Sequence, residues 1–159
     1  MFIYFAENYT QYFSFLNIFN YITFRTGAAI LTSLFFTLIF GEMIIKYLSN
    51  LQPKGQPIRK DGPQRHIVEK IGTPTMGGIL ILLSILVSFF LWAKLTNIYV
   101  LISLLSCIIF GLIGFLDDYK KIYSENSSGL NVSTRIFFQV VGSFFIILLI
   151  YNKLPENIN

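Results

Sequence analysis

The feature that most limits how this chain can fold is a stretch of 19 residues without a charged side chain, from Ile98 to Leu116. A helix needs about 20 predominantly apolar residues to cross the hydrocarbon core of a bilayer. The composition agrees, because 54% of the 159 residues are hydrophobic and 13% are charged, whereas a soluble domain has about 25% charged residues. So short a soluble chain could not enclose that much apolar surface. We therefore predict an integral membrane protein.

Several apolar stretches of this kind predict an all-α fold, a polytopic membrane bundle of about four transmembrane helices. The predicted spans are residues 26–48, 75–93, 98–116 and 136–151. A short turn, residues 94–97, separates the second span from the third, which predicts an antiparallel hairpin. Aromatic residues mixed with polar ones precede the first span, as is typical of a membrane–water interface. We interpret residues 1–159 as a single membrane domain.

Two polar loops, residues 49–74 and 117–135, connect the spans and carry most of the basic residues. These are Lys54, Arg59, Lys60, Arg65, Lys70, Lys120, Lys121 and Arg135. The opposite side of the predicted bundle has Arg25, Lys94 and Lys153. Because basic residues in short loops mark the cytoplasmic side, both loops are predicted to be cytoplasmic and both termini to lie outside.

Two adjacent acids, Asp117 and Asp118, stand where the third span meets water. The C-terminal end of a helix is already negative, so the pair calls for a cation. Lys120 and Lys121 are one candidate, and a divalent metal such as Mg2+ is the other. Neighbouring residues on a helix point about 100° apart, so we expect that the acids cannot share one pocket if the helix continues through them. A solvated acidic helix end is the alternative, and the spacing favours neither.

A second motif is the run from Gly72 to Gly78 at the start of the second span, Gly-Thr-Pro-Thr-Met-Gly-Gly. Thr73 is predicted to cap the helix, with Pro74 in its first position. Free N–H groups at a helix start favour a phosphate, but for the run taken alone, ordinary helix capping and tight packing of glycines between membrane helices are the favoured explanation. An acidic pair, this helix start and several lysines at one face together suit phosphoryl transfer.

Other polar residues have simpler explanations. Glu42 and Lys46 are spaced for an ion pair on one helix face, and His66 is interpreted as a loop residue. The single cysteine, Cys107, excludes a disulfide within one chain, and the single histidine excludes a histidine-cluster metal site. Nothing in the sequence indicates nucleic-acid binding.

At these motifs the chain resembles the phospho-N-acetylmuramoyl-pentapeptide-transferases, also called MraY or translocase I. The resemblance covers essentially the whole chain. Its matching segments are Tyr21–Arg25, Asp61–Pro63 followed by His66, Gly72–Gly78, and Gly111–Tyr119 with its acidic pair. The Thr-Pro-Thr-Met-Gly-Gly run is specific to this branch, whereas the wider polyprenyl-phosphate sugar-1-phosphate transferase superfamily shares the acidic pair and varies that run.

The resemblance implies a bacterial enzyme of peptidoglycan synthesis that transfers phospho-MurNAc-pentapeptide from UDP-MurNAc-pentapeptide to undecaprenyl phosphate. The products are lipid I and UMP, the cofactor is Mg2+, and the active face of the multi-pass inner (plasma) membrane protein is cytoplasmic. By motif, Asp117 and Asp118 are the implied catalytic acids, with their individual roles left open. Lys70, Thr75 and Lys121 match substrate-binding positions, and Arg135 stands where the family is expected to have lysine.

The family fold has about ten spans, so the chain is expected to be a fragment that is inactive alone. The main Mg2+ ligand is expected in the later part of the family fold, and a second polypeptide or a homodimer is left open as a partner. Two alternatives remain. One is a superfamily member that uses a different UDP-sugar, and the other is a non-catalytic membrane subunit or small transporter with four spans, for which Gln139 would be the clearest polar residue inside a span.

Overall fold

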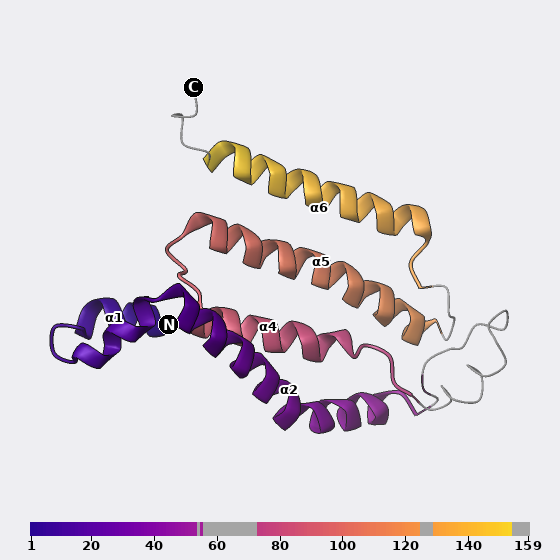
Figure 1. Cartoon of the computed structure of the whole chain (residues 1–159). Coiled ribbons are helices and arrows are strands. Elements are labelled where there is room, and N and C mark those ends of the chain that lie inside the picture. Colours follow the sequence, from indigo (N-terminus) through magenta and orange to yellow (C-terminus); the bar gives the residue numbers. More distant parts are fainter. Residues whose placement is uncertain (54, 56–72, 125–128, 154–159) are drawn as a thin grey trace.

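The structure, a computed structural model, describes residues 1–53, 55, 73–124 and 129–153, and every regular element in these ranges is helical. The elements are α1 (Phe2–Tyr9), the 3-10 helix η1 (Ser14–Asn20), α2 (Ile22–Leu51), α4 (Gly78–Trp92), α5 (Ile98–Tyr123) and α6 (Val132–Lys153). Figure 1 shows the four long helices side by side. The prediction of an all-helical fold is confirmed.

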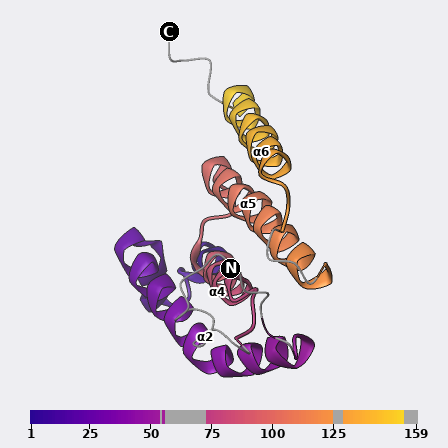
Figure 2. The same ribbon diagram turned by 90° about the vertical axis from the view of Figure 1, so that its right-hand side faces the viewer.

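The long helices form an open row in the order α2, α4, α5 and α6. Each helix packs on its neighbours in this order, and in the part of the chain that the structure describes no helix contacts a more distant member of the row. Figure 2 shows the row from its end. Both faces of the row are therefore largely open, and many apolar side chains such as Leu38 and Phe137 are exposed. Such surfaces are suited to contact with lipid or other membrane helices.

Among the described residues, three helices, α2, α5 and α6, are long and apolar enough to cross a membrane by length and composition. They contain the predicted spans 26–48, 98–116 and 136–151 within their bounds. The fourth, α4, is apolar but has 15 residues. At about 1.5 Å per residue it is roughly 22 Å long, which is less than the roughly 30 Å of a bilayer core.

Helix α4 begins later than the sequence predicted, and the predicted cap at Thr73 is wrong. The N-cap residue is Gly77, which makes no capping hydrogen bond through a side chain. The reason lies in the preceding residue, because Met76 has a φ of 72°. A helix cannot pass through a residue in the left-handed region, so Thr73 and Pro74 remain outside α4.

Helix α5 continues to Tyr123, although a loop was predicted from residue 117. The first residues of the predicted loop 117–135 are thus helical, and α6 takes up its last residues from Val132. Lys120 and Lys121 lie in the last turn of α5, where positive charge compensates the helix dipole. The predicted span ended at Leu116 because charged residues follow it. These charges are paired with one another along the helix, so α5 continues through them.

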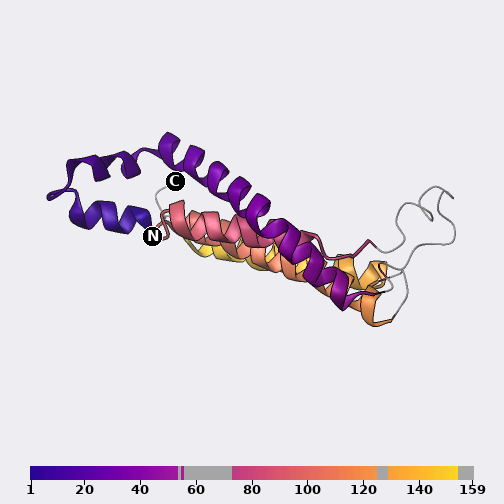
Figure 3. The same cartoon turned by 90° about the horizontal axis from the view of Figure 1, so that it is seen from below.

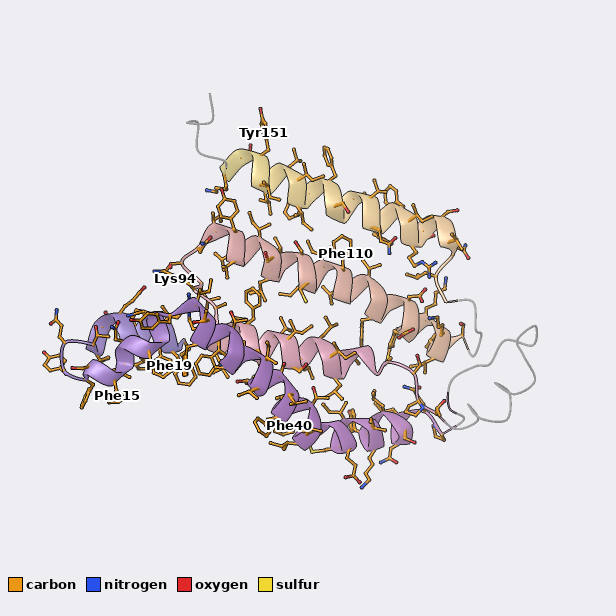
Figure 4. The ribbon with its side chains drawn as sticks, viewed as in Figure 1. Phe15, Phe19, Phe40, Lys94, Phe110 and Tyr151 are labelled. Atoms are coloured by element: carbon orange, nitrogen blue, oxygen red, sulfur yellow. The ribbon has the colours of Figure 1, made fainter. Side chains whose placement is uncertain are left out.

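The two ends of the row differ. At the end that we call the acidic end, the last part of α5, which carries Asp117 and Asp118, lies next to the starts of α4 and α6 and the end of α2 (Figure 1). At the opposite end, which we call the aromatic end, the rings of Phe2, Phe19 and Trp92 pack together with centroids 4.7 to 6.0 Å apart. Helices α1 and η1 project beyond the row there (Figure 3), and Figure 4 labels Phe19 and Lys94 at this end.

Small residues allow the helices of the row to approach closely. A Cβ atom at Gly111 would lie 2.8 Å from a side-chain carbon of Leu82, and one at Gly142 would lie 2.9 Å from Ile109. These glycines set the spacing of α5 against α4 and of α6 against α5, as small residues do between membrane helices. On the outer helix α2, Glu42 and Lys46 form the predicted ion pair, with 2.8 Å between their charged groups.

Candidate functional site

The acidic pair is held by a lysine one turn further along the same helix. The Nζ atom of Lys121 lies 2.7 Å from Oδ2 of Asp117 and 2.8 Å from Oδ1 of Asp118. These are i,i+4 and i,i+3 pairs, so the continuation of α5 through the acids creates the contact. The sequence suggested Lys120 and Lys121 as cations for the acidic pair, and Lys121 contacts both acids.

The two acids differ in burial. The side chain of Asp117 is 10% exposed, whereas that of Asp118 is 31% exposed. Asp117 has both carboxylate oxygens engaged, since its Oδ1 accepts a hydrogen bond of 2.9 Å from the backbone N–H of Leu130 and its Oδ2 faces Lys121. Asp118 uses Oδ1 for Lys121, and its Oδ2 has no partner among the described residues. One acid is therefore fixed on all sides and the other is partly available.

The segment before α6 completes the surroundings of Asp117. Gly129 has a φ of 58°, and a Cβ atom there would lie 2.7 Å from Oδ1 of Asp117. Glycine satisfies both demands, because it lacks the Cβ atom and adopts positive φ without strain. Sequence reasoning missed Gly129 and Leu130. The Ser-Gly pair at 128–129 is a turn signal that could have directed attention there.

The other motif approaches the same end through a clamp on Thr75. The backbone N–H of Thr75 donates to Oε1 of Gln52 at 2.9 Å, and Nε2 of Gln52 donates back to the Thr75 carbonyl at 3.3 Å. Gln52 is buried and follows the end of α2. Its amide thus fixes the chain just before the left-handed Met76, and sequence reasoning had no signal for it.

These elements border one groove. A cavity of about 430 Å3 lies between the start of α4, the end of α5 and the start of α6. Its polar lining comes from Asp117, Asp118, Arg135 and Gln139, and Met76 lines it from the motif before α4. The expectation that neighbouring acids on a continuous helix cannot share a pocket is wrong. The reason is that the groove spans the space between three helices and is wide enough to meet both side chains.

The other predicted binding residues have different positions. Lys121 lies behind the acids, and Thr75 lies before the groove-lining Met76, so neither lines the groove itself. Lys70 falls outside the described residues, as do His66 and the basic residues between positions 56 and 72. Arg135 and Gln139 are one turn apart on α6, and both meet the groove.

A second cavity, which is apolar, shares part of its wall with the groove. It has a volume of about 230 Å3, lies between α4 and α5, and is lined by apolar residues such as Leu86 and Ile108. Ile79, Gly111 and Phe115 line both cavities. A charged groove and an apolar cavity therefore lie against some of the same residues of α4 and α5.

The carboxylates suit part of a Mg2+ site. No cluster of three or more His, Cys, Asp or Glu side chains with metal-binding geometry is present among the described residues. However, Mg2+ next to phosphates commonly uses one or two carboxylates and takes its other ligands from substrate and water. Asp118, which lines the groove and has one oxygen without a partner among the described residues, fits such a partial ligand set.

The comparisons with known proteins agree with these features. Residues 70–82 match signature 1 of the phospho-N-acetylmuramoyl-pentapeptide-transferases. The signature includes Lys70, Thr75 and Met76, and therefore the segment that Gln52 clamps beside the groove.

A relative is similar over most of the chain. The phospho-N-acetylmuramoyl-pentapeptide-transferase of Maricaulis maris (strain MCS10) is 48% identical over 137 residues, which are 86% of this chain and 36% of that protein. The chain thus spans about a third of the length of the curated relative that it matches. Similarity at this level, together with the apolar helices, indicates a bacterial membrane protein. The signature and the relative show that the chain belongs to the phospho-N-acetylmuramoyl-pentapeptide-transferase family.

Proposed function

We propose that the groove at the acidic end is one side of an active site that transfers phospho-MurNAc-pentapeptide from UDP-MurNAc-pentapeptide to undecaprenyl phosphate. The observation that carries the proposal is the junction of two environments. Asp117, Asp118 and Arg135 line the groove, and an apolar cavity that shares lining residues with it lies between α4 and α5. A phosphate on a long polyprenyl chain has the same two parts.

In the proposed reaction an oxygen of the lipid phosphate attacks the phosphorus next to the sugar. The pyrophosphate bond breaks, UMP leaves, and lipid I forms. Phosphoryl transfer depends mainly on positioning and on neutralising charge on the phosphate oxygens. Arg135 lies where its guanidinium can contact a phosphate, and one carboxylate of the pair accepts the proton of the lipid phosphate. Lys121 orients both acids, since its Nζ lies within 2.8 Å of a carboxylate oxygen of each.

Mg2+ is the proposed cofactor, held in part by Asp118. When bound, it would neutralise charge on the diphosphate. Asp117 is not proposed as a ligand of Mg2+, because its two carboxylate oxygens already contact Lys121 and the backbone N–H of Leu130. The other ligands of the ion would therefore come from groups other than these two acids. The chain spans about a third of the length of its relative. The activity is therefore proposed for the protein as it is assembled in the native membrane and not for these residues alone.

The test is a substitution of the acids at the native gene, so that everything that completes the protein is present. Membranes from cells that carry Asp118→Asn should release no UMP above background when supplied with both substrates and Mg2+. The variant must remain in the membrane at the normal level. Normal UMP release would reject the active site proposed here, and release with a different UDP-sugar in the unsubstituted protein would reject the substrate.

The orientation is a separate proposal, with the acidic end in the cytoplasm and the aromatic end outside. It is supported by the basic residues of the loops around the acidic end. In a Cys107→Ser background, a membrane-impermeant maleimide applied to spheroplasts should label Thr96→Cys, which lies between α4 and α5 at the aromatic end. It should not label Ser124→Cys at the end of α5. The reverse labelling pattern would reject this orientation.

A further inference from the structure

A second groove lies at the aromatic end, between α2 and α4 and at the far end of the row from the acidic pair. Its volume is about 520 Å3. The start of α2 contributes Arg25 and Thr26, and the turn after α4 contributes Lys94 and Asn97. None of these residues belongs to the site described above, so the inference that follows does not depend on the proposed function.

Two polar groups in this groove lack partners. Nε of Arg25 and Oγ of Ser88 are both buried, and neither has a hydrogen-bond partner among the described residues. Ser88 is 7% exposed and lines the groove from the C-terminal part of α4. Buried polar groups in native proteins are nearly always hydrogen-bonded, because an unpaired one keeps the full cost of leaving water.

Arg25 and Ser88 can both donate hydrogen bonds to the same acceptor. The guanidinium of Arg25 is a cationic donor, and the hydroxyl of Ser88 can donate as well. Within the described residues, no carboxylate pairs with Arg25, whereas Lys94 is already paired with Glu7 at 2.7 Å. The missing partner is therefore an anion that accepts several hydrogen bonds, and a phosphate group is an anion of that kind.

The remaining lining is apolar. Ile22, Ile30 and Ile85 border the groove and are exposed on their other sides, and Phe89 and Trp92 close it toward α4. Because α2 is long and apolar enough to cross a membrane, this lining continues along a surface suited to lipid. A free phosphate would use Arg25 and Ser88 but leave the apolar lining without a partner.

We propose that this groove binds a membrane phospholipid, with the phosphate on Arg25 and Ser88 and an acyl chain along the isoleucines of α2 and α4. The lipid would supply the hydrogen bonds that the fold leaves open. It would also join α2 to α4 at the end where α1 and η1 extend beyond the row.

Trp92 provides a direct readout, since it lines the groove and is the single tryptophan of the chain. The delipidated protein in detergent is titrated with a phospholipid brominated in its acyl chains, and quenching of Trp92 fluorescence is recorded. Saturable quenching is expected. Arg25→Gln should weaken the apparent affinity at least about tenfold, as loss of a charged hydrogen-bonding group does. Native mass spectrometry should show the same loss of retained phospholipid.

Two matched controls separate binding from folding. Lys153→Gln removes a positive charge at the same end but outside the groove, and should leave the curve unchanged. Ser88→Ala should weaken binding, whereas Ser84→Ala, four residues earlier on α4, should not, because Ser84 is buried outside the groove and donates to Ile81 at 2.8 Å. Circular dichroism and size-exclusion chromatography check that each variant is folded.

Three outcomes would overturn the proposal. One is quenching that rises without saturation and equally in Arg25→Gln, which would show general contact with the micelle. The second is displacement of the lipid by millimolar inorganic phosphate alone, which would show a site for free phosphate. The third is a single loss of affinity shared by Ser84→Ala and Ser88→Ala, which would show an effect on α4 rather than on the groove.

Discussion

The two ends of the helix row treat their charges in opposite ways. At the acidic end Lys121 neutralises Asp117 and Asp118 from within the same helix, and Leu130 satisfies a remaining oxygen. At the aromatic end Arg25 has a buried nitrogen and no partner among the residues described. The acidic end is therefore organised before any ligand arrives, and the aromatic end requires a ligand to complete it. Preorganised charges suit catalysis, whereas unsatisfied ones suit binding.

The largest expected effect tests the acidic end directly. Asp117→Asn at the native gene should lower UMP release by about 10³-fold, in the range that loss of a catalytic acid or base produces. Glu42→Gln is the matched control, because it removes the same charge from an exposed ion pair with Lys46 on the outer helix. Equal turnover of the two variants would show that the groove acids have no special role.

Substitution of Lys121 at the acidic end and of Arg25 at the aromatic end should have different effects on the free energy of unfolding. Lys121→Met leaves two acids without their cation, and should lower the free energy of unfolding by about 2–3 kcal/mol, since breaking a largely buried pair strands a charge. Arg25→Gln strands no carboxylate, so in lipid-free detergent it should leave stability unchanged. Thermal unfolding of both variants measures this. Equal destabilisation would contradict the distinction between the ends.

Gly129 is expected to contribute to stability for two reasons, its positive φ and its lack of a Cβ atom. Gly129→Ala must accommodate a φ of 58° and a Cβ atom 2.7 Å from Oδ1 of Asp117. We expect a loss of about 1–2 kcal/mol in stability, together with lower turnover as Asp117 moves. Gly27→Ala in α2 is the control, because a Cβ atom there meets nothing within 4 Å. Its stability should be unchanged or slightly higher.

The sequence predicted much of this fold because its strongest signals are local. Charge-free runs identify membrane helices, and the helices α2, α5 and α6 contain their predicted spans. The family was recognisable from the Thr-Pro-Thr-Met-Gly-Gly run, and the signature match at residues 70–82 confirms it. The roles of Asp117, Asp118, Lys70, Thr75 and Lys121 in substrate binding or catalysis stay predictions.

The parts that the sequence did not predict depend on contacts between distant residues. Nothing in the neighbourhood of Gln52 indicates that its amide pairs with Thr75, 23 positions away. The end of α4 was predicted well, but its start was not, because the left-handed Met76 is not a residue type that usually adopts positive φ. Likewise, the groove that admits both acids arises from three helices, and spacing along one helix could not show it.

The smallest of these effects concerns the clamp on Thr75, and it tests whether the acidic end is organised by more than its charges. Gln52→Ala removes two hydrogen bonds, one of 2.9 Å and one of 3.3 Å, and leaves partly buried backbone groups of Thr75 unpaired. We expect about 1–2 kcal/mol of lost stability and a lower turnover at saturating substrate, because the strained Met76 is no longer fixed beside the groove. Gln52→Glu keeps the hydrogen-bond acceptor but loses the donor, so its stability and turnover should lie between those of Gln52→Ala and those of the unsubstituted protein. If Gln52→Ala lowered stability without changing turnover, the clamp would support the fold alone. The catalytic organisation of the acidic end would then rest on the Lys121 pairs and Gly129.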